Sequence, residues 1–223
     1  MKICCKSTMA NSRTTFTPPV CLSGFPPNTP YGNLTLKLMK LIGRIDEANR
    51  RLAEVECFWA IAISPVLHPN AAERHHYAIE QAIYLMRRAA DDLIALISCL
   101  SDWKAEGDYP KRIQVDCIGF LLAEKNAPKR LPLYDSHLSM LRLLNEISNA
   151  YKHSFVQTDI NLIGRDEPVA YALALDYNKL ESGVQFFDAP LSSMVGDFTQ
   201  FYKDCFTWLE EFSTQHRPGA TGH

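Results

Sequence analysis

The chain lacks a long uninterrupted apolar segment. Its longest apolar stretch, residues 57–67, is broken by Ser64 and Pro65, whereas a membrane-spanning helix needs roughly 20 apolar residues. Residues 1–6 likewise contain no apolar run that could form a secretory signal. These absences predict a cytoplasmic protein with no membrane association.

Paired cysteines and an excess of one charge are also absent. The seven cysteines are an odd number and include no C-x-x-C pair, which argues against a disulfide framework or a zinc ribbon. Four of them lie in apolar helical patterns, as buried, reduced thiols do: Cys57, Cys99, Cys117 and Cys205. The formal net charge of −2 provides no overall basic field, so binding of nucleic acid would need a local patch.

Motifs for nucleotide binding, hydrolase chemistry and metalloprotease chemistry are missing as well. The chain has no P-loop, dinucleotide-binding glycine motif, nucleophile elbow or H-E-x-x-H, and we expect no cofactor. His76 and Glu80 are four residues apart and could share a metal, but no third ligand stands at a diagnostic spacing. We therefore expect a surface hydrogen bond there and no metal site.

The chain is rich in helical periodicity, which predicts a mainly α fold. Apolar residues recur every three to four positions over 34–63, 70–104, 111–125, 135–157 and 191–212. Alternating patterns at 159–163 and 169–177, with a further short run at 184–187, predict a β-hairpin or small sheet. We expect an up-and-down bundle of about five helices, with a small β-hairpin (about 159–187) inserted before the last helix. Its single domain would span 34–214, between a Pro/Ser/Thr-rich tail (1–33) and a second tail (215–223).

Specific residues are predicted to bound and fill these helices. Asn33 and Asn70 are candidate N-caps, the second in a capping box with Glu73, and Pro190 is a candidate for the first position of the last helix. Several apolar residues of the third and fourth helices are expected to face inward: Ile113, Cys117, Phe120 and Leu121, then Leu141, Leu144, Ile147, Tyr151 and Phe155.

The fourth predicted helix also carries a polar face. Arg142, Glu146, Asn149 and His153 follow one another at spacings of four, three and four residues, which places them on one side of the helix. The face is either simply solvated or a polar cleft, which could lie at a dimer interface. Lys152 and His153 lie in the last turn, where the helix dipole favours cations, and together could hold a phosphate or a carboxylate.

The stretch Ser148-Asn149-Ala150-Tyr151-Lys152-His153, on a late helix of a predicted bundle, resembles the HEPN superfamily. Nuclease members of that family carry Arg-Asn-x-x-x-His, so Asn149 and His153 match while Ser148 occupies the arginine position. The resemblance covers roughly 34–157 and 190–213, and it implies a homodimer in which two motifs meet in one cleft. In the family nucleases the histidine transfers protons and the arginine stabilises charge on the phosphate.

Serine cannot supply that cation, and Arg142 is eleven residues from His153, roughly 16 Å along a helix. A substitute would have to come from elsewhere, with Arg87 or Arg88 as candidates. We therefore expect a non-catalytic, dimerising module that binds an RNA or protein partner; the resemblance suggests a bacterial defence or toxin–antitoxin setting.

Two alternatives stay open. One is a metal-independent endoribonuclease, in which His153 transfers protons and Asn149 orients the phosphate. The other is a small-molecule-binding bundle, with a pocket between the hairpin and the helices.

Overall fold

The computed structural model describes residues 25, 29–64, 68–155, 166–175, 178–179, 181 and 183–216. Within them the chain forms a mainly helical bundle with a two-stranded antiparallel sheet before the last helix, as predicted. Most of the tail predicted for 1–33 and the strand predicted for 159–163 lie outside the described residues. The elements in chain order are α1 Leu34–Ala62, α2 Ala71–Glu106, α3 Ile118–Leu122, η1 Glu124–Lys129, η2 Pro132–His137, α4 Leu138–His153, β1 Val169–Leu175, β2 Val184–Pro190 and α5 Leu191–Gln215.

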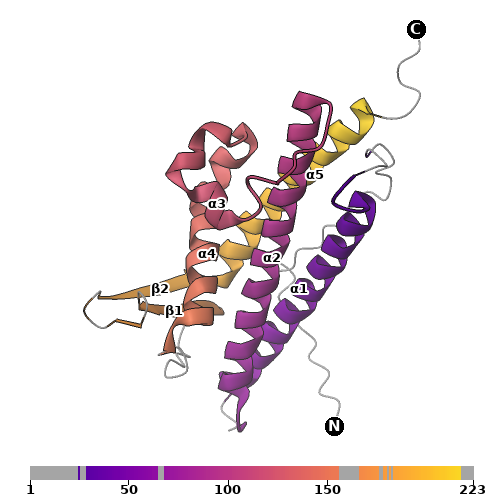
Figure 1. Cartoon of the computed structure of the whole chain (residues 1–223). Coiled ribbons are helices and arrows are strands. Elements are labelled where there is room, and N and C mark those ends of the chain that lie inside the picture. Colours follow the sequence, from indigo (N-terminus) through magenta and orange to yellow (C-terminus); the bar gives the residue numbers. More distant parts are fainter. Residues whose placement is uncertain are drawn as a thin grey trace.

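Helices α1 and α2 form an antiparallel pair that runs the length of the bundle (Figure 1). Helix α2 also contacts α3, α4 and α5, so it lies in the middle. Most of its central apolar residues are buried, among them Ile83, Leu93 and Ile97, although Tyr84 is 57% exposed. The prediction of a central helix, apolar on most sides, is confirmed.

The two predicted N-caps behave differently. The side chain of Asn33 accepts a hydrogen bond from the Leu36 backbone N–H at 3.1 Å, which confirms it as the cap of α1. Asn70 instead adopts a left-handed backbone, with φ of 64°, and its side chain makes no capping bond. Glu73 accepts a hydrogen bond from the Tyr77 hydroxyl at 3.2 Å, so the predicted capping box is wrong.

The predicted third helix is largely wrong. Only α3 is α-helical, and its first backbone N–H, that of Ile118, donates to the buried Asp91 carboxylate of α2 at 2.9 Å. A carboxylate fixed in α2 thus sets where the helix begins, which periodicity along the chain does not reveal. Cys117 is the half-buried cap before it, and Phe120 is 39% exposed. The 3₁₀ helix η1 replaces part of the loop predicted after it.

The fourth predicted helix is shorter than expected. Its first residues form η2, and α4 ends at His153 because Ser154 adopts an extended backbone with ψ of 121°. Phe155, expected in the core, is 85% exposed. The rest of the core stripe is confirmed, since Leu141, Leu144 and Ile147 are fully buried.

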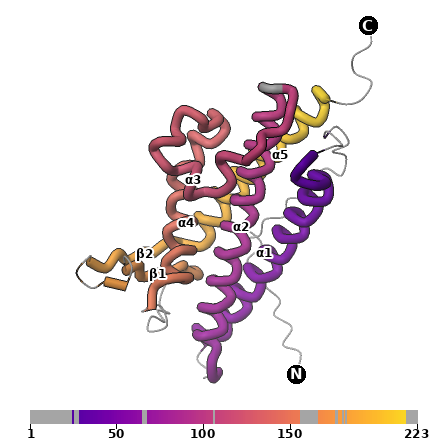
Figure 2. Tube along the Cα trace, viewed as in Figure 1, coloured from indigo at the N-terminus to yellow at the C-terminus, as the bar shows by residue number. Residues whose placement is uncertain are grey.

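Strands β1 and β2 pair antiparallel, with Val169 opposite Pro190 and Leu175 opposite Val184. The hairpin packs on α4 through β1, and it projects beside that helix in Figures 1 and 2. Ala170 and Ala172 are fully buried on the packed face. Their small side chains let the strand approach the helix closely.

Helix α5 closes the bundle and contacts α2, α4, η2 and β2. Pro190 is the last residue of β2 and the cap of α5, one position before the predicted one. The helix continues to Gln215, beyond the predicted end at Phe212, and Gln215 accepts a hydrogen bond from Lys104 at 2.9 Å. Across the described part of the chain, no helix combines the length and the apolar character that crossing a bilayer requires.

Candidate functional site

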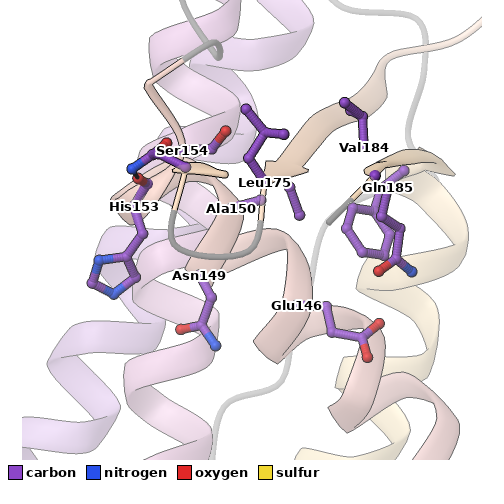
Figure 3. Close-up of a pocket in the computed structure, with 12 residues that line it drawn as sticks. Glu146, Asn149, Ala150, His153, Ser154, Leu175, Val184 and Gln185 are labelled. Carbon is purple, nitrogen blue, oxygen red and sulfur yellow. Dashed lines mark hydrogen bonds between the residues drawn. The ribbon is translucent and has the colours of Figure 1, made fainter. Parts of the chain in front are cut away.

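A cleft of about 940 Å³ lies between α4 and the hairpin. We call it the hairpin cleft. One wall is the α4 face that carries Glu146, Asn149 and His153, and the other is formed by β1, β2 and the segment between them (Figure 3). Its remaining described lining residues are Ala150, Ser154, Ala174, Leu175, Asn178, Gly183, Val184, Gln185 and Phe187.

The polar face predicted for the fourth helix supplies the first wall. Glu146 and Asn149 are half-buried and His153 is exposed. In Figure 3, Asn149 lies between His153 on one side and Glu146 on the other, with Gln185 beyond Glu146. Arg142, one turn before Glu146, is exposed and does not belong to the lining. Of the two interpretations of this face, the polar cleft therefore fits Glu146, Asn149 and His153.

The hairpin wall adds amide and apolar groups. Gln185 pairs with Ala174 across the strands, and the neighbouring pair on the same face is Phe187 with Ala172. Phe187 is buried against the bundle, whereas Gln185 and Val184 are exposed at the mouth of the cleft. The wall thus offers a carboxamide above an apolar base.

Asn178 fixes the hairpin to the end of α4. Its Nδ2 donates to the His153 carbonyl at 3.0 Å, and its Oδ1 accepts from the Phe155 backbone N–H at 2.9 Å. Its left-handed backbone, with φ of 56°, is one that asparagine tolerates better than most residues. One side chain from the hairpin therefore satisfies two backbone groups at the helix terminus.

The residues directly before Asn149 and His153 lie outside the cleft. Ser148, at the position of the family arginine, is buried in the bundle, and Lys152 is exposed on another side of α4. Neither belongs to the lining. The predicted joint anion site of Lys152 and His153 therefore gains no support from the geometry.

The candidate substitute arginines of α2 are also placed elsewhere. Arg87 donates to the Asn145 side chain at 3.4 Å and does not belong to the described lining of the cleft. Arg88 forms an ion pair with Asp92 at 3.6 Å. Asp91, in the next turn of α2, is buried, and burial raises the pKa of its carboxyl group. No residue of α2 belongs to the described lining that includes His153.

The electrostatic character of the cleft follows from its described lining. Glu146 is its one carboxylate, and neither lysine nor arginine occurs in it. Nowhere in the described part of the chain do three or more His, Cys, Asp or Glu side chains gather as metal ligands would. The arrangement can donate and accept hydrogen bonds, but it has no permanent cation to hold a phosphate.

His76 and Glu80 lie between α2 and α4. The His76 ring meets the Tyr151 ring edge-on, with 5.6 Å between their centroids. Burial lowers the pKa of His76 and raises that of Glu80, so both shifts disfavour the charged forms. The Tyr151 hydroxyl is buried without a hydrogen-bond partner among the described residues. The predicted surface hydrogen bond is wrong, because His76 packs against a core tyrosine.

Sequence reasoning missed three polar residues of the cleft, namely Ser154, Asn178 and Gln185. Gln185 lies in a predicted strand whose apolar residues indicated the strand, but nothing in the pattern indicated a role for the glutamine. Ser154 follows the motif directly, and its buried Oγ has no hydrogen-bond partner among the described residues. The turn at Asn178 could have been predicted from the sequence, since asparagine near the end of a strand favours a left-handed turn.

Comparisons with protein-family models, with curated proteins and with solved structures found no match for this chain.

Proposed function

We propose that this protein is a non-catalytic binding module that takes a small polar organic molecule in the hairpin cleft. One observation carries the proposal: Glu146 and Asn149 of α4 and Gln185 of β2 line a cleft of about 940 Å³ whose described lining contains no lysine or arginine. A cleft of this size, with an apolar base and a few convergent polar groups, is typical of ligand sites.

The polar groups define the chemistry of the ligand. The carboxamides of Asn149 and Gln185 each donate and accept hydrogen bonds, while Glu146 accepts them. Such a set matches a neutral or cationic molecule with amide-like edges, such as a nucleoside base or an amino-acid amide. An anionic ligand would meet the Glu146 carboxylate without a lysine or arginine to offset it.

The same cleft is the basis of the HEPN-like alternative, in which RNA or a protein is the partner and two copies pair. Support for it comes from the helical bundle and from the position of Asn149 and His153 on one face of α4. Ribonuclease activity would need a cation beside His153, and the described lining supplies none. Binding without cleavage is therefore the version that we favour.

The binding proposal is tested by NMR titration of the full chain with uncharged nucleosides and amino-acid amides, observing the side-chain amide signals of Asn149 and Gln185. We expect both signals to shift with a neutral ligand, and Asn149→Ala to weaken binding about fivefold to tenfold, the effect of one or two hydrogen bonds. Lys152→Ala, outside the cleft on the same helix, is the matched control and should bind as the parent does.

An absence of shifts with every ligand, or equal binding by Asn149→Ala, would contradict the proposal. Cleavage of end-labelled RNA in EDTA by the parent, and not by His153→Ala, would instead establish the ribonuclease alternative.

A further inference from the structure

A second, smaller hollow of about 300 Å³ lies between α1 and α2, and α1 lies on the other side of α2 from the hairpin in Figure 1. We call it the seam pocket. The helices are antiparallel, so Arg44 of α1 stands beside Asp92 of α2, and Leu34 lies towards Cys99. Tyr31 and Ile113 complete its lining, and the Tyr31 hydroxyl donates to the Pro110 carbonyl, which holds the two covering segments together.

One wall of the seam pocket is cationic. Lys37, Lys40 and Arg44 line it from successive turns of α1, at spacings of three and four residues. Asp92 is the one carboxylate in the described lining, and it already pairs with both Arg44 and Arg88. Among the described residues, neither Lys37 nor Lys40 forms an ion pair.

Two carboxylates lie near this wall: Asp92 in the lining, and Asp102, whose negative charge acts on Tyr31 and Cys99. Burial lowers the pKa of Arg44, and the like charge of Arg88 lowers it further. Residues 1–33, which precede α1, contain no aspartate or glutamate, so that segment brings no carboxylate to the lysines. In a chain whose net charge is −2, three cations and one carboxylate line this pocket, with Asp102 beside it.

The floor of the pocket is apolar. Leu34, Leu41 and Leu96 are buried along it, and Ile113 is half-buried at its end. Cys99 is buried there as well, and burial raises the pKa of its thiol to about 11, so the sulfur remains neutral. The floor therefore contributes apolar contact and no competing charge.

We infer that the seam pocket binds a small amphipathic anion, whose carboxylate or phosphate head contacts Lys37 and Lys40 and whose apolar body lies on Leu41 and Leu96. Charge-assisted hydrogen bonds to the two ammonium groups would hold the head. Burial of the apolar body would supply the remaining binding energy. This site is separate from the hairpin cleft and does not depend on the function proposed for it.

The inference is tested on the full chain with methyl-labelled protein, by titration with octanoate, hexyl phosphate and uncharged octan-1-ol. The methyl groups of Ala95, Leu96 and Ile113 report on this pocket alone. We expect both anions to shift these signals, and octanoate to bind about tenfold more tightly than octan-1-ol, the difference made by a charged head. A shift with one anion only would assign the head as carboxylate or phosphate.

The double variant Lys37→Gln/Lys40→Gln should lose about tenfold in octanoate affinity, while Lys203→Gln, an exposed lysine on α5, should bind as the parent does. Both exchanges are at exposed positions, and a matching thermal midpoint verifies the fold. Three results would overturn the inference: no shift of the pocket methyl groups with either anion, equal affinity for octan-1-ol, or full affinity in the double variant.

Discussion

The hairpin cleft and the seam pocket differ in the charge of their linings. The cleft has one carboxylate and neither lysine nor arginine among its described residues, whereas the pocket has three cations and one carboxylate. Arg87 and Arg88, adjacent in α2, show how this separation arises. Neighbouring residues of a helix point about 100° apart, so Arg87 turns to Asn145 of α4 and Arg88 turns to Asp92, beside α1. The small net charge of the whole chain therefore does not predict the charge of either lining.

The two hollows also differ in how they are supported. Buried side chains of two long helices form the floor of the seam pocket, and we expect Leu41→Ala to lower the free energy of unfolding by about 3 kcal/mol through lost apolar burial and the cavity left behind. Urea denaturation measures this loss. Leu36→Ala, on the same helix but 56% exposed, should change stability by less than about 0.5 kcal/mol. Similar losses in both variants would mean that the pocket floor is not part of the packed core.

The missing cation of the hairpin cleft cannot be restored from Ser148. Because Ser148 is buried in the bundle, Ser148→Arg should lower the free energy of unfolding by about 2 kcal/mol or more, the cost of forcing a large charged side chain into packed space. Thermal denaturation checks this expectation. Asn149→Arg, one residue later and lining the open cleft, is the matched control and should cost less than about 1 kcal/mol. Gain of RNA cleavage with an unchanged thermal midpoint in Ser148→Arg would show that this position reaches the cleft.

The hairpin wall of the cleft depends on two hydrogen bonds from one side chain. Asn178→Gly retains the left-handed backbone but loses both bonds, which should cost about 0.5–1 kcal/mol and speed hydrogen exchange at the Phe155 amide. Asn178→Ala should cost about 1 kcal/mol more, because a Cβ atom disfavours that backbone conformation. Unchanged exchange at Phe155 in both variants would mean that the hairpin is held to α4 by packing alone.

The smallest effect concerns pH at the opposite end of the α1–α2 pair. The buried His75 contacts the Val55 carbonyl through Nδ1 at 3.1 Å, and burial lowers its pKa below the ordinary value of 6.5. A lowered pKa in the folded protein means that the unfolded chain binds the proton more readily. The stability that neutral His75 contributes is therefore complete above the ordinary pKa and is lost as the pH falls through the lowered value.

The urea midpoint of unfolding should thus drop less between about pH 7.5 and about pH 5.5 in His75→Gln than in the parent. His153→Gln, at an exposed histidine, should retain the parental difference. The paired variants isolate His75 from Asp91 and Glu80, whose raised pKa values favour the folded protein as the pH falls. An equal decline in His75→Gln and the parent would rule out this histidine as a source of the pH dependence.

Much of the fold was predictable because helical periodicity records burial directly. The inward stripes of α1 and α2, the cap at Asn33 and the strand pattern at β2 were all readable. The errors occurred at residues whose conformation depends on a distant partner. Asp91 sets the start of α3, and Asn178 caps α4 from the hairpin. Neither partner is within one helical turn of the segment that it controls, so a local pattern cannot reveal it.

For the candidate site, the sequence placed Glu146, Asn149 and His153 on one face of a helix, because the helical repeat fixes their relative directions. The tertiary structure decided what faces them. It brought Gln185 across the cleft, left Arg87 and Arg88 outside the described lining, buried Ser148 and left Lys37 and Lys40 beside an apolar floor. The physical reason is that a periodic sequence states which side of an element is apolar, whereas the neighbours of its polar side are chosen by the packing of the whole chain.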